Sequence, residues 1–279
     1  MLEPGVLLGL GSAVAWGTGD FAGGVAARRA GGMAVAGGAQ VAGCLLLVAA
    51  VVVLHPAAPS GTTLLLGALG GMAGGLGLAA LYRALAMGAM GLVSAVSGVG
   101  GVLIPLAVSV LLWGAPINPL QLAGIGFALA AMAAASGATR QGVNRQAITL
   151  ALAAALGFGL WFVFLNRAAE HDQLWALVAS RASASLLVGG MALRRINRSG
   201  LRAAVPLIAI AGALDVAANG LVVLSFASIP VGISAALSCT YPLVTMLLAR
   251  TLLREALPRL GLAAVALAVA GIVLISLGS

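Results

Sequence analysis

Long apolar stretches separated by short polar gaps follow one another along the whole 279-residue chain. A membrane-spanning helix needs about 20 mainly apolar residues, and prolines, glycine clusters and charges divide the chain into ten stretches of this kind. These are 4–24, 33–54, 62–86, 90–113, 119–138, 146–167, 174–195, 203–226, 230–253 and 258–277. Their alanine- and leucine-rich composition favours helices over the alternating strands of an outer-membrane barrel. The pattern predicts an all-α integral membrane protein with ten transmembrane helices.

Composition agrees with this prediction and excludes other classes of protein. Hydrophobic residues make up 62% of the chain and charged residues 7%, and the mean hydropathy is +1.17. A soluble domain carries about 25% charged residues. The net charge of +8 would suit nucleic acid, but the basic residues are spread over short gaps and offer no contiguous surface to a phosphate backbone. We expect the lipid bilayer, and no nucleic acid, as the large partner.

The second half of the chain repeats the first at an offset of 140 positions. Residues 15–19 (AWGTG) align with residues 155–159 (ALGFG), and the ends of the apolar stretches keep the same register throughout. Five helices per repeat is an odd number, so the second repeat enters the membrane from the opposite side. We expect residues 1–139 and 140–279 to form two inverted-topology repeats in a single membrane unit, with a solute site near the midplane. An accidental match between two apolar halves is the alternative.

Arginines in the short gaps predict the orientation. Twelve lie in or within a few residues of the gaps after the first, third, fifth, seventh and ninth stretches, whereas only Arg167 lies beside the other gaps. Basic residues in short loops mark the cytoplasmic side of a membrane protein. The arginine-bearing gaps should therefore be cytoplasmic, and both termini should lie on the outer side.

Several motifs carry a resemblance to a known family. Trp16-Gly17 lies late in the first stretch, residues 82–85 (YRAL) end the third, and residues 234–243 (SAALSCTYPL) form a small-residue run that ends near a proline. Glu255 follows this run, and Ala115 stands at the corresponding place in the first half. With ten helices and a duplication, the chain resembles the EamA-type drug/metabolite transporters over essentially its whole length.

The resemblance implies export or facilitated passage of small metabolites, often amino acids, across a bacterial inner membrane. It also implies a cavity whose walls come from the first, third, fourth, sixth, eighth and ninth stretches. We expect an amino-acid exporter or facilitator that works by alternating access, with a small-molecule solute as partner and a single chain as functional unit. A proton-coupled multidrug or organic-cation exporter is the alternative, and an enzyme acting on lipid headgroups is a remote one.

Two polar residues of the eighth stretch are candidates for solute binding. Asp215 and Asn219 are one helical turn apart and share a face. An ionisable side chain near mid-membrane costs at least about 2.5 kcal/mol, so it normally faces a cavity or a partner. Asp215 either contacts a solute amine, serves as a proton-sensitive gate, or forms an ion pair with Arg181 of the seventh stretch. Asp20 of the first stretch is a second coupling candidate, although the preferred interpretation there is an interfacial charge at a helix end.

Aromatic residues within the spans are candidates for the cavity wall. Trp16 and Trp161 lie inside the first and sixth stretches, and Tyr82 and Tyr241 are the only tyrosines. An indole face or a phenol can contact an aromatic or cationic group. Simple packing is the competing interpretation for all four.

Smaller residues complete the list of candidates. The hydroxyls of Ser94, Ser97 and Ser238 can line a weakly polar passage or bond back to their own helices. Pro105 and Pro242 lie inside predicted helices, where each can kink its helix and act as a gating joint. The third stretch carries a glycine stripe, residues 67–77, that should allow close helix packing.

The sequence offers little for chemistry. It contains no Walker loop for ATP, and its two histidines, His55 and His171, are too isolated to suggest a metal site. No nucleophile, base and orienting group can be assembled. We therefore expect a transporter without cofactor or metal, and not an enzyme.

Overall fold

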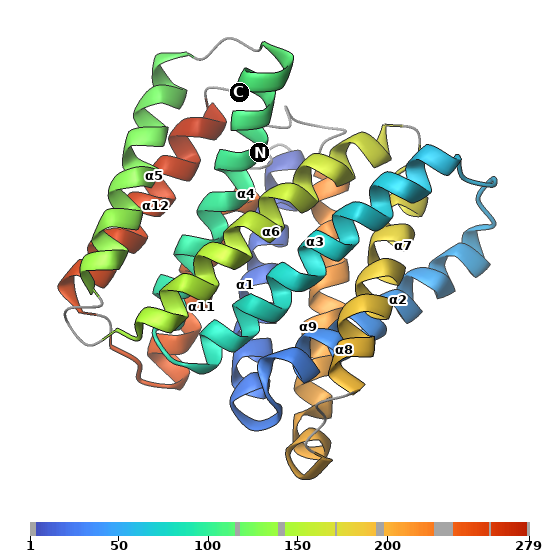
Figure 1. The fold of residues 1–279 in the computed structure, drawn as a ribbon, viewed down its shortest axis with the longest axis horizontal. Helices are drawn as coiled ribbons and strands as arrows, with labels where there is room; N and C mark the ends of the chain where they lie inside the picture. Colours follow the sequence, from blue (N-terminus) through green and yellow to red (C-terminus); the bar gives the residue numbers. More distant parts are fainter. Residues whose placement is uncertain are drawn as a thin grey trace.

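The computed structural model is a bundle of long helices (Figure 1). It describes residues 4–114, 118–138, 143–170, 172–193, 198–225, 237–256 and 258–277. Within these ranges there is no β-strand. The helices are α1 (Pro4–Ala30), α2 (Gly32–Leu54), α3 (Gly61–Ala86), α4 (Met90–Trp113), α5 (Pro119–Ala138), α6 (Arg145–Ala169), α7 (Gln173–Ala184), the π-helical η2 (Ser185–Gly189), α8 (Gly190–Leu193), α9 (Arg198–Ser225), α11 (Tyr241–Leu252) and α12 (Arg259–Leu277).

These bounds follow the predicted stretches closely. Because α7, η2 and α8 run on without a break, they correspond to the single predicted stretch 174–195. Residues 230–236 of the ninth predicted stretch lie outside the described residues. Six helical segments of the described part are long and apolar enough to cross a membrane: 32–54, 61–86, 90–112, 145–169, 173–193 and 200–222. The chain is thus a multi-pass membrane protein, and ten spans remain a prediction.

Local capping explains where several helices begin. The Ser60 hydroxyl accepts a hydrogen bond from the Thr63 amide at 3.0 Å, at the start of α3. Asp172 accepts from the Trp175 amide at 2.9 Å, at the start of α7. Such caps satisfy amide groups that have no partner inside the helix.

Helix pairs recur between the two halves of the chain. α3 packs on α6 and α7, while α9 packs on α1 and α2; likewise α4 packs on α6 and α11 on α1. Exchanging the halves at the predicted offset, with α1 for α6, α2 for α7, α3 for α9 and α4 for α11, turns each of these pairs into another observed pair. This is the pattern expected of a duplication, whereas the inverted topology itself remains a prediction.

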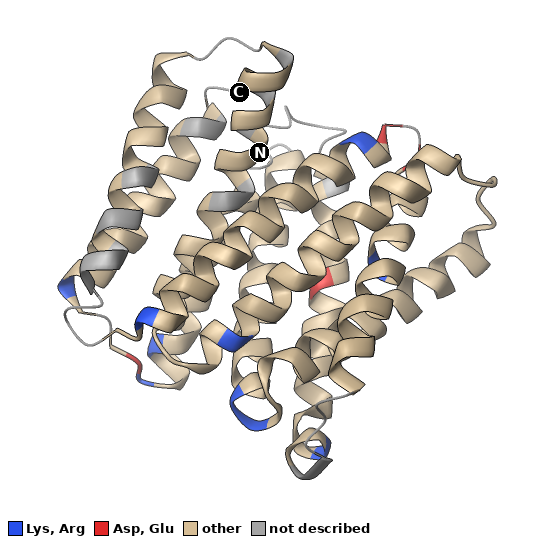
Figure 2. Ribbon diagram, viewed as in Figure 1, with Lys and Arg blue, Asp and Glu red and all other residues tan. Residues whose placement is uncertain are grey.

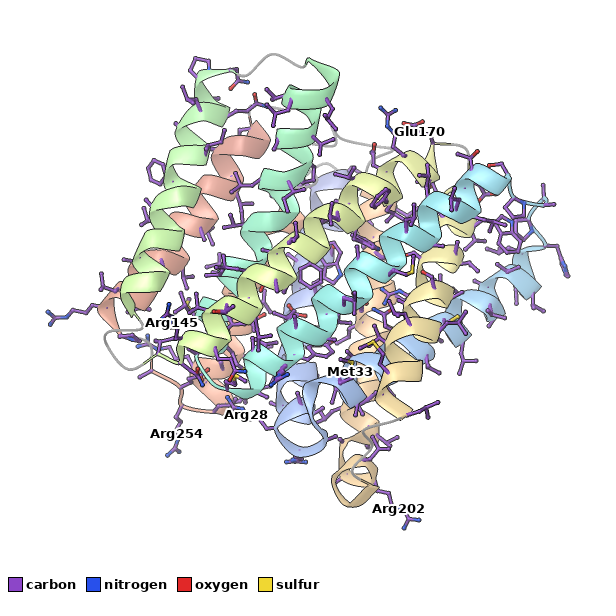
Figure 3. The ribbon with its side chains drawn as sticks, viewed as in Figure 1. Arg28, Met33, Arg145, Glu170, Arg202 and Arg254 are labelled. Atoms are coloured by element: carbon purple, nitrogen blue, oxygen red, sulfur yellow. The ribbon has the colours of Figure 1, made fainter. Side chains whose placement is uncertain are left out.

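Most basic residues gather at one end of the bundle (Figure 2). Arg28, Arg145, Arg202 and Arg254 lie at this end, which we call the arginine end, and Glu170 lies at the opposite end (Figure 3). The start of α1 and the end of α12 also lie toward the end opposite the arginines (Figure 1). The bundle therefore has the charge asymmetry on which the predicted orientation rests.

The largest buried cluster also lies at the arginine end. It joins the last turns of α1 and α3 to the first turns of α2, α4 and α6, and its members include Ala26, Leu85, Met90 and Ala151, each without exposed surface. Close packing of this kind leaves few voids as large as a water molecule. We therefore interpret the arginine end as the closed end of the bundle.

The glycines of α3 form two faces. A Cβ at Gly67, Gly71 or Gly75 would press on α7 or its π-helical extension, and a Cβ at Gly70, Gly74 or Gly77 would press on α6. At Gly74 that Cβ would lie 2.7 Å from the Trp161 ring. Small residues thus let α3 lie between α6 and α7 at close range, as the sequence predicts.

We expect Gly71→Ala to destabilise the protein by about 1–3 kcal/mol, because the added Cβ would overlap the Ser180 carbonyl oxygen and the Ser183 hydroxyl. Thermal unfolding of the detergent-purified protein measures the effect. Gly126→Ala is the matched control, because a Cβ at that helical position of α5 meets nothing within 4 Å. The packing argument is wrong if both variants melt at the same temperature.

Candidate functional site

A cavity lies in the middle of the bundle, between helices from both halves of the chain. The empty space there amounts to about 690 Å³, a figure that includes open solvent at the mouth of the cavity. Side chains of α1, α2, α3, α4, α6, α7, α9 and α11 line it. The sequence prediction omits two of these helices, α2 and α7, which contribute Gln40, Ser180 and Arg181.

A buried ion pair joins two walls of the cavity. Arg181 of α7 and Asp215 of α9 lie 2.5 Å apart, and 6% of the Arg181 residue is exposed. The guanidinium also donates to the Gln40 side-chain oxygen at 2.7 Å, and the Trp16 indole N–H donates to the other Asp215 oxygen at 3.0 Å. Of the three interpretations of Asp215, the ion pair with Arg181 is the one present in this structure. One polar network thus connects α1, α2, α7 and α9.

Aromatic rings form much of the remaining wall. The Trp16 ring makes edge-on contacts with Phe162 and Tyr241, with ring centroids 6.3 Å and 6.2 Å apart. Trp161 packs against Phe162 at 4.9 Å and donates its indole N–H to the Ser180 hydroxyl at 3.0 Å. Trp16, Trp161 and Tyr241 thus line the cavity together. The edges and faces of these rings suit an apolar or aromatic part of a solute.

Asp20 lies in this cavity, and its interfacial interpretation is corrected. It lines the wall and only 8% of its surface is exposed. The predicted first stretch ends at residue 24, which would put Asp20 one turn from the helix end, whereas α1 continues to Ala30. No hydrogen bond or ion pair joins its carboxylate to any residue that the structure describes. Asp20 and Asp215 are close enough to repel each other electrostatically.

Asn219 lies one turn beyond Asp215 and also lines the cavity. It is 3% exposed, and its side-chain oxygen has no hydrogen-bond partner among the described residues. A buried acceptor of this kind is costly unless a ligand or water satisfies it. Asn219 therefore remains a candidate contact for a solute donor.

The other predicted wall residues lie in two different places. Ser97 lines the cavity, but its hydroxyl donates to the Val93 carbonyl at 2.8 Å within its own helix. Tyr82, Ser94 and Ser238 are buried outside the lining. The Ser94 carbonyl accepts from the Tyr241 hydroxyl at 3.3 Å.

Tyr82 packs under the cavity rather than in its wall. Its ring occupies the space beside Gly23, where a Cβ would overlap it. Gly23 is three residues from Asp20, so Tyr82 lies on the Asp20 side of α1, toward the arginine end. The Tyr82 ring belongs to the large buried cluster at the arginine end.

The two prolines have different settings. Pro105 lies inside α4, as the sequence predicts. Pro242 does not lie inside a continuous helix, because Cys239 and Thr240 form a turn and α11 begins at Tyr241. Proline is favoured in the first helical turn, where its missing amide costs no hydrogen bond. The described part of the ninth stretch is thus interrupted beside the cavity.

Glu255 makes a contact between the two halves at the arginine end. Its carboxylate accepts hydrogen bonds from the amides of Ala89, at 2.5 Å, and Met90, at 3.0 Å, and lies 3.6 Å from the Arg28 guanidinium. The residues before α4, Met87-Gly88-Ala89, contain no side chain that can cap it. A carboxylate from the second half therefore caps a helix of the first half. Ala115, at the corresponding place in the first half, lies outside the described residues.

Sequence reasoning missed Phe158, Phe162 and Ser180 as parts of the site. Trp161 and Phe162 follow Phe158 by three and four residues, so all three side chains can share one face of α6. That spacing was the available signal. Ser180 stands 140 positions after Gln40, so the duplication relates two polar residues that both line the cavity.

Comparison with known proteins identifies the second half of the chain. Residues 145–277 match the EamA-like transporter family. The resemblance to EamA-type transporters is confirmed. The matched family is one of membrane transporters of small solutes and not of enzymes.

One solved structure has a fold similar to that of this chain. A solved structure titled only as the crystal structure of a protein superposes with a TM-score of 0.63, covering 99% of this chain and 97% of that one. The two sequences are 18% identical, so this likeness concerns the fold alone. No protein of curated function matches this chain in sequence.

We expect Arg181→Met and Asp215→Leu each to destabilise the protein by about 3–5 kcal/mol, because each leaves a buried charge without its partner. The double variant should lose less than the sum, since it removes both charges. Thermal unfolding in detergent measures all three variants.

The exposed ion pair Arg167–Glu170 supplies the control. Both side chains are more than 40% exposed, and Glu170→Gln should change the stability by less than about 1 kcal/mol. Additive effects of Arg181→Met and Asp215→Leu would contradict the proposed energetic coupling of the buried pair.

Proposed function

We propose that this protein carries a small amino-acid-like solute across a bacterial inner membrane by alternating access through the central cavity. The observation that carries the proposal is the cavity itself, because it combines aromatic walls with an internally paired Arg181–Asp215 network. Such a lining suits a small solute with an apolar body and few charges. A multiply charged phosphate ester would require more basic groups than the lone Arg181.

The closed arginine end supports alternating access. Transporters of this kind expose a midplane site to one side at a time. The packed cluster around Leu85 and Met90, together with the Glu255 contact, shuts one end of the cavity. If the arginine end faces the cytoplasm, this conformation is closed to the cytoplasm, and both termini lie on the periplasmic side.

A single chain is proposed as the functional unit. The proposal rests on the described lining, to which helices of both halves of the chain contribute.

A proton-coupled exporter of organic cations is the second candidate function. One observation favours it: Arg181 offsets Asp215, whereas Asp20 adds a carboxylate without a counter-charge among the described residues. An acidic cavity lined by indole rings attracts cations. Both candidates use the same cavity and differ in the solute and in its coupling to protons.

Uptake into proteoliposomes tests the proposed function. The purified protein should accelerate the flux of aromatic and aliphatic amino acids above that of empty liposomes, with saturation. Organic cations form the second panel, and both panels are measured with and without a pH gradient. Flux of organic cations alone, and only with a gradient, would favour the second candidate; no flux of any solute would overturn both.

We expect Glu255→Ala to loosen the arginine end, because the variant removes the acceptor for two amides of α4 and the partner of Arg28. A cysteine introduced at Ala84, which has no exposed surface, reports the opening through its rate of labelling by an impermeant thiol reagent. Loss of a cap costs about 0.5–2 kcal/mol, so the labelling rate should rise up to about 30-fold.

The control for this measurement is Glu170→Ala, which removes an exposed carboxylate at the opposite end of the bundle. Both variants are made in a background that lacks Cys44 and Cys239. An unchanged labelling rate in Glu255→Ala would show that Glu255 does not hold this end closed.

A further inference from the structure

The Asp20 carboxylate is a buried negative charge for which the described structure supplies no partner. It lines the cavity at 8% exposure, and neither a hydrogen bond nor an ion pair reaches it from any described residue. Asp215, by contrast, is held by Arg181 and Trp16. An isolated carboxylate in a low-dielectric environment is costly unless a cation accompanies it. The position beside Asp20 therefore requires one positive charge from outside the protein.

The surrounding helices do not provide that charge. α9 presents Asp215, α3 presents Tyr82 and α11 presents Tyr241 to this region. Arg181 of α7 is the cation nearest in the cavity lining, and it is engaged by Asp215 and Gln40. The cavity-lining residues of α2, α4 and α6 are uncharged.

The basic residues of α1 and α3 lie outside the lining. Arg28 and Arg29 are two turns or more from Asp20 at the arginine end, and Arg28 faces Glu255. Arg83 lies in the last turn of α3 and does not line the cavity. The charge balance of the cavity is therefore one carboxylate in excess.

The chemistry near Asp20 favours a cation that carries N–H groups. Trp16 lies one helical turn from Asp20 on the same side of α1 and presents an indole ring to the cavity, and such rings attract cations. The unpartnered side-chain oxygen of Asn219 is a second hydrogen-bond acceptor in the lining. A primary ammonium group supplies both the charge and the donors, whereas a quaternary ammonium supplies only the charge.

We propose that Asp20 is a cation site that holds either one proton or the primary ammonium group of the solute, but not both. This rests on the proposed function and assigns its solute selectivity and proton exchange to one residue. When the solute enters, the O–H bond of the Asp20 carboxyl breaks and its proton passes to water. The ammonium N–H groups then donate to the carboxylate, no bond of the solute changes, and the charge of the cavity stays constant when the solute is a monocation.

Binding of phenethylammonium to the purified full-length protein tests this exchange. Because protons compete for Asp20, the affinity should fall toward acid by up to about tenfold per pH unit between about pH 8 and about pH 5. Titration calorimetry in buffers of different ionisation enthalpy should show proton release that approaches one per bound solute at the acid end. An affinity independent of pH in the unmodified protein would overturn the proposal.

Variants assign the effect to Asp20. Asp20→Asn should weaken binding by about tenfold or more and abolish both the pH dependence and the proton release. Asp172→Asn is the matched control, because Asp172 lies outside the cavity lining and caps the start of α7, where asparagine caps equally well. This variant should behave as the unmodified protein. Proton release that persists in Asp20→Asn would overturn the assignment. If that variant does not fold, the pH series and Asp20→Glu, which should keep the proton release, still decide.

Two further measurements separate the parts of the proposal. Phenethyltrimethylammonium should bind at least about tenfold more weakly than phenethylammonium, and equal affinities would overturn the hydrogen-bonded amine. Absence of flux in proteoliposomes would overturn the proposed function, while proton release on binding would still establish the Asp20 site. The two failures are therefore distinguishable.

Discussion

The ion pair between Arg181 and Asp215 is the interaction on which the rest of the site depends. Two charges at the middle of an apolar bundle are tolerated only when they neutralise each other and their remaining hydrogen-bonding groups find partners. Gln40 and Trp16 provide those partners, so one network holds α1, α2, α7 and α9 around a common point. The polar lining of the cavity is thus also a structural constraint on where these helices lie, and a solute must bind beside the pair or compete with it.

Glycines make the opposite wall possible. Because α3 presents glycines to α6 and α7 at six positions, these helices approach its backbone there and bring Trp161 and Ser180 to the cavity edge. Larger residues at Gly71 or Gly74 would occupy the space that these side chains use. Close packing on one wall and a charged network on the other therefore define the two sides of the cavity.

Hydropathy predicted the helices well because lipid leaves a spanning segment no alternative to internal backbone hydrogen bonding. The site was harder to predict, since side-chain depth depends on helix ends that hydropathy locates poorly. Asp20 illustrates this: six further residues of α1 moved it from an expected interface into the cavity. Sequence also identified Asp215 and Arg181 as possible partners, but only the placement of α7 and α9, which both pack on α2, decides between an ion pair and a free carboxylate. The partners of Glu255 lie 165 and 166 positions away, and no local pattern reveals them.

The predicted duplication does not make the two ends of the bundle equivalent. Glu255 ties the second half to the amides of α4, whereas the corresponding position in the first half is Ala115, whose side chain cannot accept a hydrogen bond. If the halves are inverted, these positions serve opposite ends of the cavity. The Glu255 cap then contributes about 0.5–2 kcal/mol to the free energy of the state closed at the arginine end. The Glu255 contact therefore favours closure at the arginine end, where the largest packed cluster lies. A solute must offset this contribution to open the arginine end.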